Sequence, residues 1–190
     1  MKKIILVLLL LLISVPVAAE IEKNAIPSEN GFDLYWWPVL PKVDGWHQDE
    51  GSSYRYSANT QAPDGAAFSN AESVIYAKAL YKPRMPDTKS LEQFIAEDIE
   101  EFKKSQSALA IEKSGLIKTK DNKTLETYRF SPKGEGNWEK VAYGEEGDFY
   151  LVFTLSSRTE QGYTATLPTF KEFIQNYEEH PNQQIKADEK

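Results

Sequence analysis

Two stretches of the chain carry apolar residues at helical spacing, with polar residues between them. The first spans about residues 90–105, begins with a capping box at Ser90, and has an expected buried face of Leu91, Phe94, Ile95, Ile99 and Phe102. The second spans about residues 167–178, with Thr166 as the expected N-cap and Pro168 in the first turn. Both patterns predict amphipathic helices that cover a core.

The other apolar positions form short runs that are typical of strands. The expected strands are residues 52–58, 73–82, 111–120, 124–130, 138–143 and 149–155. The last four are joined by short links rich in Asp, Asn and Gly, which favours hairpins and an antiparallel meander. Residues 149–155 are apolar on both faces and are expected at the centre of the sheet, Phe153 among them. The pattern predicts an α+β fold in which helices flank an antiparallel sheet.

The first nineteen residues have a different pattern. Lys2 and Lys3 precede an aliphatic run over residues 4–13, and small residues up to Ala19 stand before Glu20. This order predicts a bacterial-type signal peptide cleaved after Ala19, and hence a periplasmic or secreted protein. An uncleaved anchor is disfavoured because the run is shorter than the ~20 residues that a spanning helix needs.

The rest of the chain suits one domain. Residues 20–30 are polar and are expected to form a flexible leader, and residues 180–190 a polar tail. The α+β domain is expected over residues 31–179. It has to fold by packing alone because the chain has no cysteine.

Charge narrows the choice of partners. The signal holds two of the 22 basic residues and none of the 29 acidic ones, so the mature chain has a net charge of −9. Such a chain is repelled by phosphate backbones and by anionic membrane surfaces. We therefore expect no nucleic-acid ligand and no stable membrane insertion after cleavage.

The order of strands, one helix, four strands and a second helix resembles the α/β/α sandwich of the PsbP/DcrB-like superfamily. That superfamily includes extrinsic photosystem proteins and small bacterial envelope proteins. The resemblance covers about residues 43–177 and is carried by Gly45-Trp46, residues 90–104 and residues 167–177. These positions determine a fold and not a site, so the resemblance implies no active-site residue.

Candidate catalytic residues are few. His47 is the one histidine expected inside the domain, because the other lies in the expected tail. A hydrolase-like site would need Ser52 or Ser53 as nucleophile, with Asp49 or Asp44 to orient the imidazole. No serine has the context of a nucleophile elbow, so a surface or capping role for His47 is the simpler interpretation.

Metal and cofactor signals are weaker still. The oxygen-rich turns at residues 121–123 and 145–148 lack the spacing of an EF-hand, and no paired histidines or cysteines suggest zinc. We expect no metal and no cofactor. Lys78 lies among apolar strand residues, and its ammonium group is expected to reach solvent.

An aromatic cluster is the strongest functional lead. Tyr35, Trp36, Trp37 and Trp46 fall within twelve residues. Such side chains dominate recognition surfaces because each brings a large contact area at a small entropic cost. They also plug the ends of cores, and the sequence leaves both alternatives open.

The sequence favours an exported envelope binding protein without catalytic activity, which recognises a protein partner. Two alternatives stay open. One is an enzyme with an unrecognised, hydrolase-like site that uses His47. The other is a structural or stress-related envelope protein without a discrete ligand.

Overall fold

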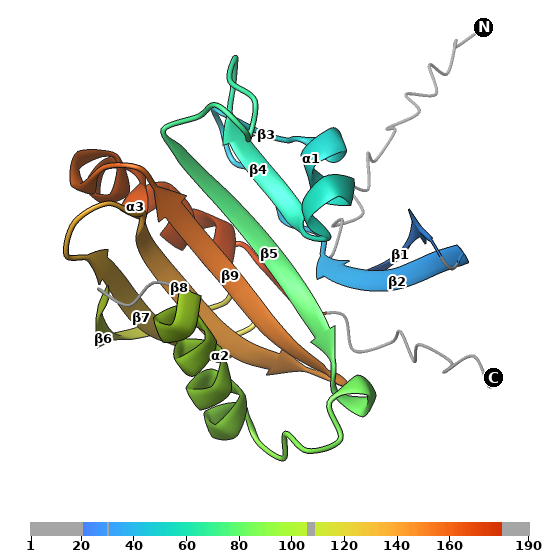
Figure 1. Ribbon diagram of the computed structural model, residues 1–190. Helices are drawn as coiled ribbons and strands as arrows, with labels where there is room; N and C mark the ends of the chain where they lie inside the picture. Colours follow the sequence, from blue (N-terminus) through green and yellow to red (C-terminus); the bar gives the residue numbers. More distant parts are fainter. Residues whose placement is uncertain (1–20, 30, 106–108, 180–190) are drawn as a thin grey trace, which may run out of the picture.

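The computed structural model describes residues 21–29, 31–105 and 109–179 (Figure 1). The expected signal peptide and the expected tail at residues 180–190 lie outside this part. The described strands are β1 (Ile21–Ser28), β2 (Gly31–Pro38), β3 (Trp46–Gln48), β4 (Asn59–Pro63), β5 (Ser73–Tyr81), β6 (Leu109–Lys118), β7 (Thr124–Pro132), β8 (Trp138–Glu146) and β9 (Phe149–Ser157). The helices are α1 (Glu50–Tyr56), α2 (Leu91–Ser105) and α3 (Glu160–Gln175), with a 3-10 turn η1 (Lys82–Arg84).

The strands form one open antiparallel sheet. Its order is β1-β2-β5-β9-β8-β7-β6, with β4 also paired to β5 and β3 paired to β4. The expected meander is confirmed, because β6 to β9 follow one another as neighbours through short links. The central position expected for residues 149–155 is also confirmed, since β9 lies between β5 and β8.

Two hydrophobic clusters hold the helices to the sheet. The larger joins α3 to β5, β8 and β9, and Phe153, Phe170 and Phe173 are each at most 1% exposed in it. The smaller joins α2 to β7, β8 and β9, and in it Phe94 stacks on Tyr150 with ring centroids 4.6 Å apart. Successive side chains of a strand point to opposite faces, which is how β9 serves both clusters.

The strand expected over residues 52–58 is wrong, because helix α1 occupies this stretch up to Tyr56. Asp49 caps the helix through its Oδ1 atom, which accepts a hydrogen bond from the backbone N–H of Ser52 at 2.9 Å. Ser57 ends it in the left-handed conformation, with φ 53°. A side-chain cap therefore outweighs the short alternation of tyrosines that suggested a strand.

The second expected helix is present but begins seven residues earlier than the pattern suggested. Its N-cap is Thr159 and not Thr166, since the Thr159 side chain accepts from the backbone N–H of Gly162 at 3.0 Å. Pro168 lies inside the helix. Proline lacks the N–H that would bond to Thr164, so one missing hydrogen bond is tolerated where Phe170 and Phe173 anchor the helix in the core.

The flexible leader expected over residues 20–30 is largely strand β1, which pairs with β2 along its whole length. Ile21 is buried, so the folded part of the described chain includes β1 and does not begin at Gly31. The polar composition that suggested flexibility suits a strand at the edge of a sheet, where one side faces solvent and charged side chains oppose aggregation.

Replacement of Phe153 by alanine should lower the free energy of unfolding by about 3–5 kcal/mol, because it leaves a cavity between β9 and α3. Leu116, which is 63% exposed on β6, is the matched control. Leu116→Ala should shift stability by no more than about 0.5 kcal/mol. Urea unfolding measures both, and equal effects would contradict the burial of Phe153.

Candidate functional site

The aromatic cluster is mostly core. Trp37 is 1% exposed and Trp36 is 7% exposed. Trp36 packs between Tyr81 and Phe149, with ring centroids at 5.2 and 5.9 Å. Of the two alternatives that the sequence left open, burial in the core describes both tryptophans. Trp36 also lines a surface hollow of about 270 Å³ together with Tyr35.

Trp46 and Tyr35, the other two members of the cluster, are more exposed than Trp36 and Trp37. Trp46 is half-buried and meets the edge of Phe173 of α3, with ring centroids 6.1 Å apart. Tyr35 is 36% exposed on β2. The four residues therefore do not form one recognition surface.

The candidate catalytic residues are also used structurally. The side chain of Ser53 is buried, and its Oγ donates to the backbone carbonyl of Asp49 at 3.0 Å. Both carboxylate oxygens of Asp49 accept backbone N–H bonds, from Ser52 and from Phe68, and these bonds lower its pKa. These contacts hold α1 and the loop between β4 and β5 in place.

His47 forms an ion pair with Asp64 when protonated, with 3.4 Å between Nδ1 and Oδ1. Both side chains are largely exposed, in a hollow of about 870 Å³ beside the loop before β3. Another pair of charges in that hollow, Lys120 and Glu178, are bonded to each other. Within the described residues His47 has no hydrogen bond to Ser52 or Ser53, so no triad is assembled.

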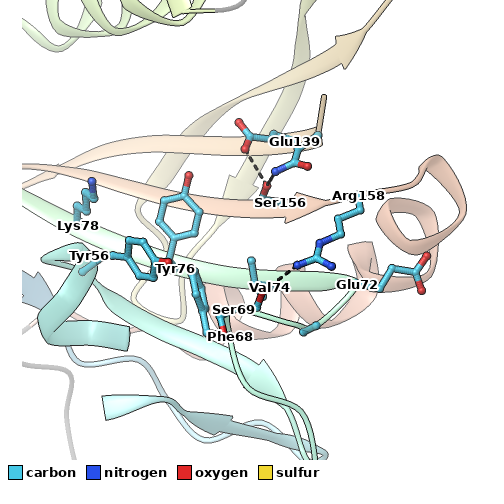
Figure 2. A pocket seen from close by; sticks show the side chains of 13 residues that line it. Tyr56, Phe68, Ser69, Glu72, Val74, Tyr76, Lys78, Glu139, Ser156 and Arg158 are labelled. Atoms are coloured by element: carbon cyan, nitrogen blue, oxygen red, sulfur yellow. Dashed lines mark hydrogen bonds between the residues drawn. The ribbon is translucent and has the colours of Figure 1, made fainter. Parts of the chain in front are cut away.

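A second groove has the chemistry that the aromatic segment lacks. It encloses about 390 Å³, and we call it the Glu139 groove (Figure 2). It is lined by Tyr56, Ala58, Phe68, Ser69, Ala71, Glu72, Val74, Tyr76, Lys78, Asn137, Glu139, Ser156 and Arg158. These residues come from four stretches of the chain: residues 56–58 at the end of α1, 68–78 in β5 and the loop before it, 137–139 at the start of β8, and 156–158 at the end of β9.

Strand register places the floor of the groove. Val74 of β5 and Glu139 of β8 both pair with Ser156 of β9, so the three side chains form one row across the sheet. By alternation they share the face on which Tyr150 and Val152 contact α2. The groove is therefore the part of this face that lies past α2, next to α1.

Glu139 is held by a short chain of hydrogen bonds. The Ser156 hydroxyl donates to Glu139 Oε1 at 2.8 Å and accepts from the Asn137 side-chain amide at 3.0 Å. No hydrogen bond joins Glu139 Oε2 to another described residue. The carboxyl group is thus oriented through one oxygen, and the other has no donor among the described residues.

Burial dominates the electrostatics of Glu139. It raises the pKa of this carboxyl to about 7, against the lowering effect of the Ser156 hydrogen bond, and the negative charge of Asp98 adds to the rise. Burial also raises the pKa of Tyr76, so its hydroxyl stays protonated at all ordinary pH values. The groove floor therefore contains a carboxyl group that changes its charge near neutral pH.

Three aromatic side chains, Tyr56, Phe68 and Tyr76, line the groove opposite Glu139, and we call them the aromatic wall. Phe68 lies between Tyr56 and Tyr76, with ring centroids 5.4 and 6.2 Å away (Figure 2). The Asp49 carboxylate bonds to the backbone N–H of Phe68 at 2.9 Å, which ties the loop that carries the wall to α1. Tyr56 and Phe68 are carried by α1 and by this loop, whereas Tyr76 stands on β5 in the same sheet as Glu139.

Two cations mark the ends of the groove (Figure 2). Arg158 already has a hydrogen-bond partner, since its Nη2 donates to the backbone carbonyl of Ser69 at 2.8 Å. Lys78 is exposed, as the sequence suggested for its ammonium group. Neither is within ion-pair distance of Glu139 in the described structure.

Sequence reasoning missed this groove because its residues are scattered over four segments. Among the residues that line the groove, the sequence pattern draws attention only to Lys78. One signal was present: Glu139 lies two positions before Val141 and four before Tyr143, so it shares a face of β8 with these buried residues. An acid at an inward position of a central strand marks either a paired charge or a site.

Comparisons with known proteins add no assignment. No protein-family model matches the chain, and a search of curated proteins found no match. In the described ranges no cluster of three or more His, Cys, Asp or Glu side chains is arranged to hold a metal ion. Nor does any helix there have the length and apolar character needed to cross a membrane.

Replacement of Glu139 by glutamine should make stability less dependent on pH. The folded-state pKa of about 7 lies above the ordinary value of 4.5, so the folded protein binds this proton more tightly than the unfolded chain. The resulting stability is fully present below pH 4.5 and is lost as pH rises through about 7. At about 1.4 kcal/mol per pKa unit, wild type should lose about 2–4 kcal/mol relative to Glu139→Gln between pH 4.5 and about pH 8.

Urea unfolding at several pH values measures this difference. Glu145→Gln on the same strand is the control, because Glu145 is exposed and pairs with Lys82 at 2.9 Å. Its difference from wild type should stay nearly constant over the same range. A constant difference for Glu139→Gln would show that Glu139 is not shielded from solvent.

Proposed function

We propose that this chain is an exported, non-enzymatic binding protein that recognises a protein partner in the cell envelope through the Glu139 groove. The observation that carries the proposal is the combination of an aromatic wall with an oriented carboxyl group in an open groove. Aromatic side chains around a few placed polar groups are typical of binding sites. A groove of about 390 Å³ accommodates one or two inserted side chains of a partner.

The fold proposal is an α/β/α sandwich similar to the PsbP/DcrB-like superfamily. Its support is the pair of hydrophobic clusters, one with α2 and one with α3, that use alternate side chains of β9. The element order after β5 also agrees, with one helix, a four-strand meander and a final helix. β1 and β2 lie before the region of resemblance.

Binding is favoured over hydrolysis by the state of the candidate nucleophile. The Ser53 hydroxyl is buried and bonded to the Asp49 carbonyl, with Thr60 Oγ1 3.0 Å away, so it has no path to a substrate carbonyl. His47 is paired to Asp64 on the surface. Neither group meets the geometric requirement for an activated nucleophile.

Site-specific photo-crosslinking in living cells tests recognition through the groove. A benzophenone amino acid at position 56, in the aromatic wall, should form an adduct with the partner. The same amino acid at position 54 is the matched control, because Tyr54 is on the same helix, is 51% exposed and contacts Trp37 away from the groove. Absence of an adduct at position 56, or equal adducts at both positions, would contradict the proposal.

Export is tested separately. Cleavage after Ala19 should give a mature chain that begins at Glu20 and carries two fewer basic residues. Intact-mass spectrometry of the periplasmic and culture fractions should find this species. A chain that retains Met1 and stays in the membrane fraction would contradict export with cleavage.

A further inference from the structure

We propose that the Glu139 groove binds an alkylammonium group, with Glu139 as its anionic partner and the aromatic wall around its methylene chain. This inference rests on the proposed binding function and specifies the chemistry that the groove recognises. A lysine side chain of a protein and a free small amine share this chemistry. The experiment below separates the two sources.

Glu139 has no countercharge among the described residues. Glu139 has a single hydrogen-bond donor among the described residues, the Ser156 hydroxyl, and it forms no ion pair with any of them. Arg158 is held by the Ser69 carbonyl instead. A half-buried carboxylate without a cation is unfavourable, so a ligand that supplies the cation gains the interaction that the described residues do not provide.

The aromatic wall favours a cation with a methylene chain. Tyr56, Phe68 and Tyr76 form a continuous series of ring contacts opposite Glu139. Aromatic rings attract cations through the negative charge of their faces and also cover methylene groups. Figure 2 shows the Tyr76 ring standing on the floor with its hydroxyl toward the Glu139 side. An ammonium group that reaches Glu139 therefore passes along aromatic surface.

The geometry of the carboxyl group selects ammonium over guanidinium. Arginine binds carboxylates best through two parallel hydrogen bonds, one to each oxygen. Oε1 of Glu139 already accepts from Ser156, so a guanidinium bonded to both oxygens would have to share Oε1 with that hydroxyl, whereas Oε2 has no donor among the described residues. An ammonium group is a compact charge with rotatable donors and needs only one such oxygen.

Charges that face Glu139 from the surrounding elements set the pH response. Asp98 of α2 raises the pKa of Glu139, while the Ser156 hydrogen bond lowers it. Tyr76 and Lys78 of β5 and Arg158 after β9 line the same groove, and with them Glu72, whose carboxylate accepts from Thr159. An ammonium ligand favours the ionised carboxyl, so its affinity should rise with pH through neutrality.

Lys78 provides an independent check. Its side chain is exposed at one end of the groove and carries the same charge as the proposed ligand. Lys78→Gln should therefore tighten ammonium binding, in contrast to the loss expected for Glu139→Gln. Opposite effects of two neutralising changes in one groove distinguish a charge interaction from general disturbance of the site.

The experiment is titration of the mature chain, followed by NMR and calorimetry, with four probes. These are n-butylammonium, n-butanol as its neutral counterpart, Nα-acetyl-lysine amide and Nα-acetyl-arginine amide. At pH 8, n-butylammonium should bind, n-butanol should bind at least tenfold more weakly, and Glu139→Gln should abolish the difference. Affinity of wild type for n-butylammonium should fall at least tenfold from pH 8 to pH 5.5, where Glu139 is protonated. Glu145→Gln on the same strand should match wild type throughout.

Each outcome decides a separate point. Binding of Nα-acetyl-lysine amide assigns the ammonium group to a protein side chain, and binding of n-butylammonium alone assigns it to a free amine. Equal binding of n-butanol, or tighter binding of the arginine probe, overturns the ammonium assignment. If no probe binds but a photo-crosslink forms at position 56, the proposed function stands and this inference fails. If n-butylammonium binds and no crosslink forms, the proposal of a protein partner fails and the ammonium inference stands.

Discussion

The structure depends on β9, which is buried and hydrogen-bonded along both edges. It pairs with β5 over nine residues on one side and with β8 over nine on the other. Phe153 and Leu155 face the α3 cluster, while Tyr150 and Val152 face the α2 cluster. Because both clusters share this strand, disturbance of β9 reaches both layers of packing at once. The chain has no cysteine, so its stability rests on burial of apolar surface such as that of β9 and not on disulfides.

The same strand also limits the site. Near its end, β9 changes from aromatic and aliphatic side chains to Thr154 and Ser156, and the α2 packing stops. A face of the sheet that no helix covers has to satisfy its polar groups locally. Ser156 does so by bonding both Asn137 and Glu139, which places a carboxyl group at the floor of an open groove.

Glu139 is costly for the fold when its carboxyl group is ionised. Burial opposes its ionised form, and the domain tolerates this cost because the large α3 cluster and the paired strands supply stability elsewhere. Groups of this kind are expected at sites where a ligand completes the interaction. The aromatic wall is positioned by other means, through the Asp49 carboxylate that caps α1 and holds Phe68. Capping and loop placement thus share one side chain.

Local pattern sufficed where one face of an element was continuously apolar. Helix α2, the meander from β6 to β9 and the central position of β9 were predictable for that reason, since periodicity reports burial directly. It failed at α1 and at the start of α3, where the caps Asp49 and Thr159 decide the boundary, and at β1, a polar strand that pairing with β2 stabilises. Whether Trp36 and Trp37 are core or surface was likewise undecidable from sequence, because aromatic residues serve both.

The groove was decided by tertiary structure alone. Strand register aligns Val74, Ser156 and Glu139, which are far apart in the chain, and α1 adds Tyr56 from a fourth stretch. The sequence by itself determined the order of the elements from β5 to α3 and the apolar residues that these elements bury, because both follow from local periodicity. Which polar residues meet, and which of them is left without a partner, depends on contacts across strands, and such contacts exist only in the folded chain.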